Sequence, residues 1–272
     1  MSTNILFVFE GARTEDMIVR SLKEYILSNE DLIITCVFGT DIYQLYREIE
    51  KDEDFDTFNL IKERNAANKI KLKDYNRNNF AEIYLFFDYD AHASLAGATN
   101  QYGNEVKEGD EKLKEMLSFF DNETEKGKLY ISYPMTEALK HIVCFETFYE
   151  LTAKCKGHNC KYKDDCDKKD ECMSELHYKA IVNQENIPHL RDIDKYTKEI
   201  WKELIIAHLS KMNYIVNSLH KFPQKIEFQQ DIFEKQLDKF INKKCPVVSV
   251  LSAFPVFVHD YFGNEKTKKL LH

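Results

Sequence analysis

The stretch that decides the fold is ILFVFEGARTE, residues 5–15 of the chain. It opens with a short apolar run, Ile5 to Phe9, which is rich in β-forming residues and stops at Glu10-Gly11. From Thr14 to Leu27, apolar residues then recur at the spacing of one helical face. The N-terminal residues therefore predict a buried strand, a tight turn and a helix.

Three further apolar runs have the same character as the first. They occupy residues 32–38, 83–87 and 129–133, and charged amphipathic segments at 41–73 and 110–120 lie between them. Parallel neighbouring strands require crossover connections and are covered on both faces. The pattern therefore predicts an α/β fold with a parallel, doubly wound sheet flanked by helices.

The pattern changes after about Phe148. A lysine- and aspartate-rich insertion carrying cysteines, residues 154–179, precedes helical segments near 195–219 and 231–240. We expect a sheet domain over residues 1–150 and a mostly helical C-terminal half over residues 151–272. No low-complexity linker separates them, so the two parts are expected to pack together.

Composition excludes several classes of protein. The chain has 272 residues, 43% of them apolar, with 8 Gly and 5 Pro, which is typical of a folded globular protein and not of a disordered one. A formal net charge of −8 argues against coating nucleic acid by bulk phosphate neutralisation, so any such contact must be local or assisted by a metal.

Two further features predict a cytoplasmic protein without a membrane partner. The longest apolar candidate, residues 247–258, is too short for a membrane span, and the N-terminus lacks the pattern of a secretory signal. In a reducing compartment the seven cysteines are not expected to form disulfides.

Acidic residues stand at the ends of two predicted strands. Glu10 closes the first strand, and Asp88 and Asp90 close the third. Ligands of open parallel sheets bind beyond the carboxyl ends of the strands, and clustered carboxylates repel unless they are protonated or bridged by a cation. Alternate residues of an extended segment project to the same side, so both aspartates can face Glu10 while Tyr89 turns away. This favours Mg²⁺ or Mn²⁺ bound through oxygen; the alternative is a set of ordinary turn-forming and helix-capping acids.

These residues resemble the toprim domain, in its OLD-like and RloB-like branch. The matching pieces are FVFEGARTE at residues 7–15 and FFDYD at residues 86–90, and the Gly-x-x-Thr-Glu continuation is the more specific part. The resemblance covers roughly the first 150 residues. It implies a Mg²⁺-dependent nuclease in which Glu10, Asp88 and Asp90 bind metal and Glu15 is a second-site acid.

A further acidic motif of that family follows the fourth strand. Here the sequence offers Glu137 in the segment SYPMTE and then Glu146, and either could complete a second metal shell. Glu137 could equally be an ordinary first-turn acid favoured by the helix dipole. Lys140, Arg13 and His92 are candidate phosphate contacts, although solvated or structural roles are commoner for such residues.

The chemistry follows from these ligands. Two cations about 3.5 to 4 Å apart can neutralise the attacked phosphate, activate a water and stabilise the leaving oxygen of a phosphodiester. Glu10 could be a ligand or the general base, and the sequence leaves this open.

The cysteine insertion predicts a possible Zn²⁺ site. Its preferred ligands are Cys155, Cys160, Cys166 and Cys172, with His158 or His177 as substitutes. The alternative is a surface loop with unrelated thiols, because tight Cys-x-x-Cys pairs are absent. The other three cysteines, Cys36, Cys144 and Cys245, are expected to be buried structural residues.

The leading hypothesis is a metal-dependent toprim nuclease that cleaves DNA or RNA, with tRNA as one option. The resemblance extends more loosely to toprim effectors of bacterial anti-phage systems of the PARIS type, which implies an ABC-type or OLD-like ATPase partner. The alternative is a non-catalytic toprim scaffold or sensor that binds such a partner. A topoisomerase or primase fits the chain length less well, and a recombination mediator fits the motif order less well. The sequence leaves the oligomeric state open, and a homodimer is one option.

Overall fold

The computed structural model describes residues 4–28, 32–49, 56–89, 109–154, 178–243 and 247–271. They form an α/β fold around a five-stranded sheet of order β2-β1-β3-β5-β4. The predicted parallel strands are confirmed: β1 (Asn4–Phe9), β2 (Ile33–Val37), β3 (Phe80–Asp88) and β5 (Gly127–Ser132). Only the two-residue edge strand β4 (Asp121–Asn122) runs antiparallel.

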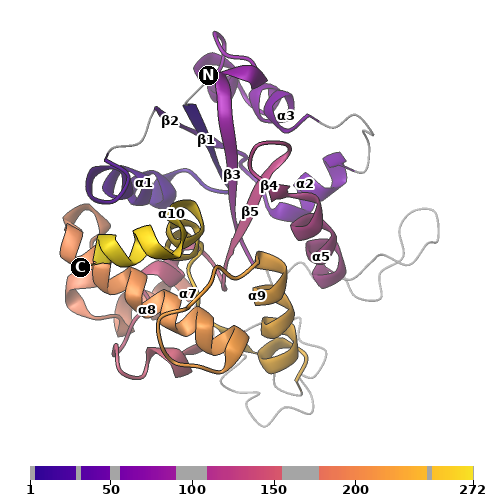
Figure 1. Cartoon of the computed structure of the whole chain (residues 1–272). Helices are drawn as coiled ribbons and strands as arrows, with labels where there is room; N and C mark the ends of the chain where they lie inside the picture. Colours follow the sequence, from indigo (N-terminus) through magenta and orange to yellow (C-terminus); the bar gives the residue numbers. More distant parts are fainter. Residues whose placement is uncertain are drawn as a thin grey trace.

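Helices cover both faces of this sheet (Figure 1). On one face lie α1 (Arg13–Tyr25) and α10 (Ala253–Leu271), and on the other lie α2 (Ile42–Ile49) and α5 (Gly109–Phe119). Two short helices, α3 (Thr57–Glu63) and α4 (Ala66–Lys71), complete the connection from β2 to β3. The helices expected between the strands are therefore present.

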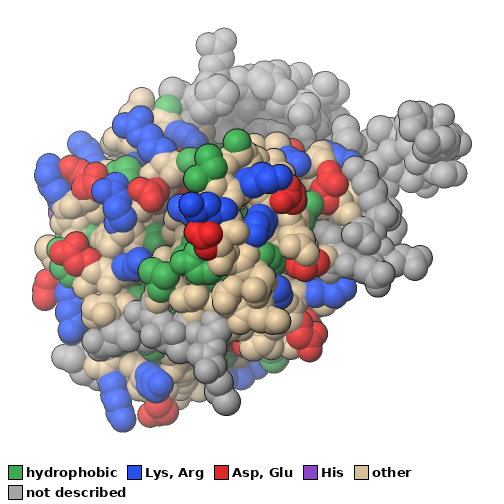
Figure 2. All heavy atoms as spheres, turned by 90° about the horizontal axis from the view of Figure 1, so that it is seen from above, with side chains coloured by type: hydrophobic (Ala, Val, Ile, Leu, Met, Phe, Trp, Pro, Cys, Tyr) green, Lys and Arg blue, Asp and Glu red, His purple; other side chains and the backbone are tan. Residues whose placement is uncertain are grey.

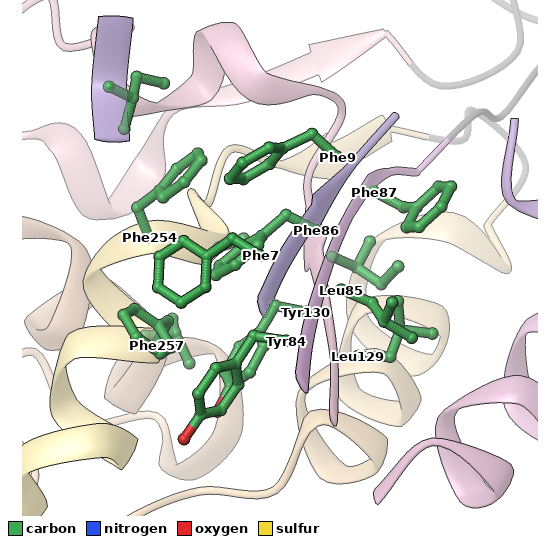
Figure 3. Packing of buried hydrophobic residues seen from close by; sticks show 14 of the residues in the cluster. Phe7, Phe9, Tyr84, Leu85, Phe86, Phe87, Leu129, Tyr130, Phe254 and Phe257 are labelled. Carbon is green, nitrogen blue, oxygen red and sulfur yellow. The ribbon is translucent and has the colours of Figure 1, made fainter. Parts of the chain in front are cut away.

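Side chains of the central strands alternate between the two faces, as the period of a strand requires. Phe86 and Tyr130 point toward α10, whereas Phe87 and Leu129 point to the opposite face (Figure 3). Phe86 stacks on Phe254 of α10 with ring centroids 4.9 Å apart and an interplanar angle of 8°. The central strands are buried on both sides, which explains why their sequences are apolar runs without alternation.

The second half of the chain packs against the first. Its longest helices are α8 (Lys198–Asn217) and α10. It also contains two shorter helices, α7 (Tyr178–Glu185) and α9 (Gln229–Gln236), and an antiparallel pair of short strands, β6 (Thr152–Lys154) and β7 (Val247–Ser249). One hydrophobic core runs continuously from β1 to α10. The expected packing of the two parts is thus observed, and the division at residue 150 stays a prediction.

The sequence did not predict α10. Residues 247–258 form an apolar stretch interrupted by Ser and Pro, and the first half of the helix, from Ala253 to His259, is buried all round and shows no amphipathic period. At Gly263 a φ of 72° interrupts the helix, which only glycine adopts readily.

Short turns complete the described chain. Five are 3-10 turns and the last is a π-helical turn: η1 (Arg77–Asn79), η3 (Thr136–Leu139), η4 (Phe148–Glu150), η6 (Pro188–Leu190), η7 (Ile193–Lys195) and η8 (Leu237–Ile241).

The surface carries mixed charge. On the face seen from above, basic, acidic and apolar side chains are interspersed (Figure 2). Among the helices of the described ranges, none has both the length and the apolar character needed to cross a membrane.

Candidate metal centre

The site lies where the strand order reverses, between β1 and β3. After β1 the chain leaves into α1 on one face, and the connection after β3 leads to α5 on the other, so a crevice opens beyond these two strands. Glu10 follows β1 directly and Asp88 ends β3. The backbone N–H of Asp88 donates to Oε2 of Glu10 at 3.1 Å. Folding therefore brings together two acids that are 78 residues apart in the chain.

A cavity of about 390 Å³ occupies this crevice. Four carboxylates line it, two from the strand ends, one from α1 and one from η3: Glu10, Asp88, Glu15 and Glu137. Polar and small residues complete the lining: Gly11, Ala12, Arg13, Thr14, Gly39, Thr40, Met135, Thr136 and Lys179. The cavity is thus rich in oxygen donors.

Glu15 reaches the cavity from the first turn of α1. Its side chain is buried, and the hydroxyl of Thr136 donates to its Oε1 at 3.4 Å. Gly11 makes room for it, because a Cβ on Gly11 would lie 3.0 Å from Oε1 and 3.2 Å from Oε2 of Glu15. The glycine of the strand-to-helix turn is therefore needed for the close approach of this carboxylate.

Glu137 enters from the turn η3, which follows β5. Its Oε1 forms an ion pair with Nζ of Lys179 at 3.3 Å. Its Oε2 is buried and has no hydrogen-bond partner in the structure. Because a buried carboxylate oxygen normally has a partner, this atom marks a place for a donor or a cation.

The electrostatics of the cavity favour a bound cation. Burial raises the pKa of Asp88 well above its usual range, and Glu10, Glu15 and Glu137 raise it further, although a hydrogen bond from the N–H of Thr136 at 2.7 Å opposes the shift. Burial lowers the pKa of Lys179, but the nearby carboxylates outweigh it and leave that pKa raised. A hard divalent cation would relieve the repulsion among the four acids.

The donor set fits such an ion in its chemistry. Glu10, Glu15, Asp88 and Glu137 offer carboxylate oxygens, which Mg²⁺ and Mn²⁺ prefer, and an unpartnered oxygen stands among them. Within the described residues, no three His, Cys, Asp or Glu side chains already converge as a ready-made metal-binding group.

Most of the predicted site residues within the described ranges meet in this cavity. Tyr89 turns away as expected, and its hydroxyl donates to Asp110 at 2.7 Å. Of the two alternatives after the fourth strand, Glu137 lines the cavity, whereas Glu146 is exposed and accepts a bond from the thiol of Cys144. Arg13 lines the cavity as well.

Other predictions fall elsewhere. Lys140 is absent from the cavity lining and binds Oδ1 of Asn183 at 3.2 Å. Cys36 is buried as predicted, but Cys144 is only half-buried. Several predicted residues lie outside the described ranges: Asp90, His92, Cys155, His158, Cys160, Cys166, Cys172, His177 and Cys245.

Three cavity residues were missed by the sequence analysis. Lys179 is the last residue of the cysteine insertion, and a single lysine at that position gives no sequence signal of a role in the cavity. Thr40 and Thr136 follow β2 and β5, and the rule that ligands bind at strand ends could have found them.

Comparison with known proteins does not place the chain in a family. No family model, no curated protein and no solved structure matches it. The function is therefore argued from the cavity and from the residue pattern.

Proposed function

We propose that the chain is a divalent-metal-dependent phosphodiester hydrolase that cleaves DNA or RNA. The observation that carries the proposal is the convergence of Glu10 and Asp88, joined by Glu15 and Glu137, at the point where the strand order reverses. Acids at such a position hold a hard cation readily and serve no evident packing purpose.

The proposed roles follow from the contacts. Glu10, Asp88, Glu15 and Glu137 would hold Mg²⁺ or Mn²⁺, which when bound supplies charge neutralisation at the phosphate and a more acidic water. The N–H of Thr136 orients one oxygen of Asp88, and the N–H of Asp88 orients one oxygen of Glu10. These bonds fix two carboxylates relative to the backbone of neighbouring strands.

Lys179 adds a positive charge at the mouth of the cavity. Its side chain is 62% exposed while that of its partner Glu137 is 8% exposed, so the ammonium group faces solvent and an incoming anion can reach it. We assign it to contact a phosphate oxygen of the substrate.

The resemblance to toprim nucleases supports a more specific version of this proposal. Described residues of the glutamate and aspartate motifs, residues 10–15 and Asp88, line the cavity, and the two motifs follow each other in the order that the OLD-like and RloB-like branch implies. On that basis the substrate is DNA or RNA, tRNA included, and the chain acts as the toxic effector of an anti-phage system under an ABC-type or OLD-like ATPase.

The test is cleavage by the purified chain. Plasmid, single-stranded DNA and tRNA are incubated with Mg²⁺ or Mn²⁺, using the wild type, Glu10→Gln and the matched control Glu146→Gln, which removes an exposed acid outside the cavity. We expect cleavage by the wild type and the control but not by Glu10→Gln. Equal cleavage by all three, or none by the wild type when freed from any partner, contradicts the proposal.

A non-catalytic scaffold is the second candidate. The absence of a ready-made metal-binding group among the described residues favours it, as does the pairing of Glu137 with Lys179. Metal affinity measured before and after Asp88→Ala separates the two functions, because a scaffold predicts no difference.

A further inference from the structure

A further cationic group, Arg64, contacts the loop after β2 that lines the acidic cavity. Arg64 follows the last turn of α3, and its Nε donates to the carbonyl of Phe38 at 3.2 Å. Its Nη2 donates to the hydroxyl of Thr40 at 3.1 Å. The guanidinium carbon also lies 4.4 Å from the centroid of the Phe38 ring. Three contacts therefore fix the orientation of this guanidinium.

The loop that Arg64 holds belongs to the cavity. Gly39 and Thr40 both line it, and the N–H of Gly39 donates to the carbonyl of Glu10 at 3.0 Å. In the part of the chain that the structure describes, Arg64 forms no ion pair with a carboxylate. Within the described residues its charge is therefore not neutralised by a carboxylate, and it lies one residue contact, through Thr40, from the cavity lining.

The sheet order arranges the charges in a row. In the order of the strands from β2 to β5, Arg64 contacts the loop after β2, Glu10 follows β1, Asp88 ends β3, and Glu137 with its partner Lys179 lies beyond β5. Neighbouring strands lie about 4.8 Å apart, so the row from β2 to β5 spans roughly 14 Å. That length exceeds a single phosphodiester and corresponds to a short run of backbone phosphates.

We propose that Arg64 binds a backbone phosphate of a polynucleotide strand, away from the phosphate that is cleaved. The inference rests on the proposed hydrolase function and specifies its substrate class: an extended strand that crosses the strand ends from Arg64 to Lys179. A guanidinium binds phosphate through two parallel N–H···O bonds, and an immobilised one loses little entropy on binding.

The test compares a long and a short substrate. Substrates are a fluorescein-labelled single-stranded oligonucleotide, as DNA and as RNA in separate arms, and the small diester bis(p-nitrophenyl) phosphate. Arg64→Gln removes the charge but keeps an amide donor for the Phe38 carbonyl. Lys69→Gln on α4 removes the same charge from an exposed ion pair with Glu63 and serves as the matched control.

For Arg64→Gln, we expect the KM of the oligonucleotide to rise about tenfold relative to the KM of the small diester. Oligonucleotide binding, measured with Ca²⁺ to block cleavage, is expected to lose about 0.7 from its slope of log K against log salt, the value for one phosphate contact on a single strand. Arg64→Lys retains the charge and is expected to restore the slope and part of the affinity. Lys69→Gln should leave both measurements as in the wild type.

The outcomes separate the two proposals. Suppose that the wild type hydrolyses both substrates, and that Arg64→Gln changes the two KM values equally and leaves the salt slope unchanged. Arg64 then only supports the loop. This result overturns the inference about Arg64 and leaves the hydrolase proposal intact. If the wild type hydrolyses neither substrate with Mg²⁺ or Mn²⁺, the hydrolase proposal itself fails. Thermal unfolding of each variant identifies loss of the fold, in which case Arg64→Lys decides through the salt slope.

Discussion

Among the described residues, two clusters of ionisable groups differ in how the surrounding protein accommodates their charge. One is the acidic cavity at the ends of β1 and β3. The other is a basic cluster beneath α8 that contains Lys211, His208 and His141, all almost fully buried. Comparing them shows which cluster serves the fold.

Two members of the basic cluster, Lys211 and His208, are satisfied by the protein itself, whereas Nε2 of His141 has no hydrogen-bond partner among the described residues and lies 3.7 Å from Oε2 of Glu185. The ammonium group of Lys211 donates to the carbonyls of Phe148 and Leu151 and lies 4.4 Å from the Phe148 ring centroid. Nδ1 of His208 accepts the N–H of Ser252 at 3.2 Å. Burial lowers the pKa of His208 to about 3 and that of Lys211 well below its usual range, so burial disfavours the charged form of both groups.

The acidic cavity differs in that it gathers four carboxylates, which repel one another although each has a partner in the protein. Its four carboxylates share one cavity with Lys179, and Oε2 of Glu137 has no hydrogen-bond partner. Repulsion of this kind lowers the free energy of unfolding unless a ligand relieves it. The comparison teaches that burial suppresses charge in the basic cluster, whereas the acidic cavity concentrates it, a cost in stability that the proposed function would explain by cation binding.

The largest expected effect comes from Asp88→Asn, which should change function and stability in opposite directions. Metal-dependent cleavage is expected to fall at least about 100-fold. The midpoint of thermal unfolding of the metal-free protein should rise by roughly 2–4 °C, because one charge leaves the cavity while the side-chain oxygen can still accept the N–H of Thr136. A lower midpoint would mean that the Asp88 carboxylate stabilises the fold, which would contradict the difference drawn between the two clusters.

Lys211→Met tests the other cluster and should act on stability alone. It removes one hydrogen bond from each of two carbonyls, which then keep only their backbone donors, so the free energy of unfolding is expected to fall by about 1–3 kcal/mol. Chemical denaturation measures this. Lys239→Met is the control, since Lys239 also donates to carbonyls of α8 but is only half-buried, and its loss should cost less. Equal losses would mean that burial of Lys211 adds nothing.

Much of the acidic cavity could be predicted from sequence because it obeys a local rule. Glu10 and Asp88 each stand directly after an apolar run, and parallel strands bring such positions to one edge of the sheet. Glu15 was expected only from the resemblance to the toprim domain, through the Gly-x-x-Thr-Glu continuation. The choice of Glu137 over Glu146 could not be made from spacing, because it depends on the path of the η3 turn after β5.

The rest depends on contacts between distant segments. Lys179 and Arg64 reach the cavity through α7 and the end of α3, and neither position carries a pattern that fixes its distance from Glu10. The basic cluster was missed for the same reason: Lys211 and His208 lie on α8, and their partners come from η4 and the segment before α10. A lysine on an amphipathic helix is normally solvated, so only the packed structure shows that Lys211 is buried.

The basic cluster should also dominate the acid sensitivity of the protein. The pKa of His208 is about 3 and that of His141 about 4 in the folded state, each lowered by burial, so the native state binds fewer protons than the unfolded state below about pH 6.5. Stability is therefore lost as pH falls from about 6.5 toward 3, at up to roughly 1.4 kcal/mol per pH unit for each histidine. His208→Gln should flatten this slope by one proton in denaturation series across pH, while the exposed control His189→Gln should not.

The acidic cavity predicts the reverse dependence. Because the pKa of Asp88 is raised in the folded state, the contribution of this group is present at low pH and is lost as pH rises above its unfolded value of about 3.8. Added Mg²⁺ or Mn²⁺ should restore the lost stability in the wild type and not in Asp88→Asn. If Mg²⁺ and Mn²⁺ both leave the stability of the wild type near neutral pH unchanged, the result contradicts a cation site in the cavity.

The smallest expected effect, and the finest test of the cavity, comes from Gly11→Ala. The new Cβ would stand 3.0 Å from Oε1 of Glu15 and push this carboxylate by a few tenths of an ångström. Mn²⁺ affinity, measured by titration calorimetry, is expected to fall about three- to tenfold if Glu15 helps to hold the ion. Gly39→Ala is the control: its Cβ meets nothing within 4 Å, but its φ of +87° makes alanine strained. That variant should lose stability and keep its metal affinity. Equal losses of Mn²⁺ affinity in both variants would mean that Glu15 does not help to hold the ion.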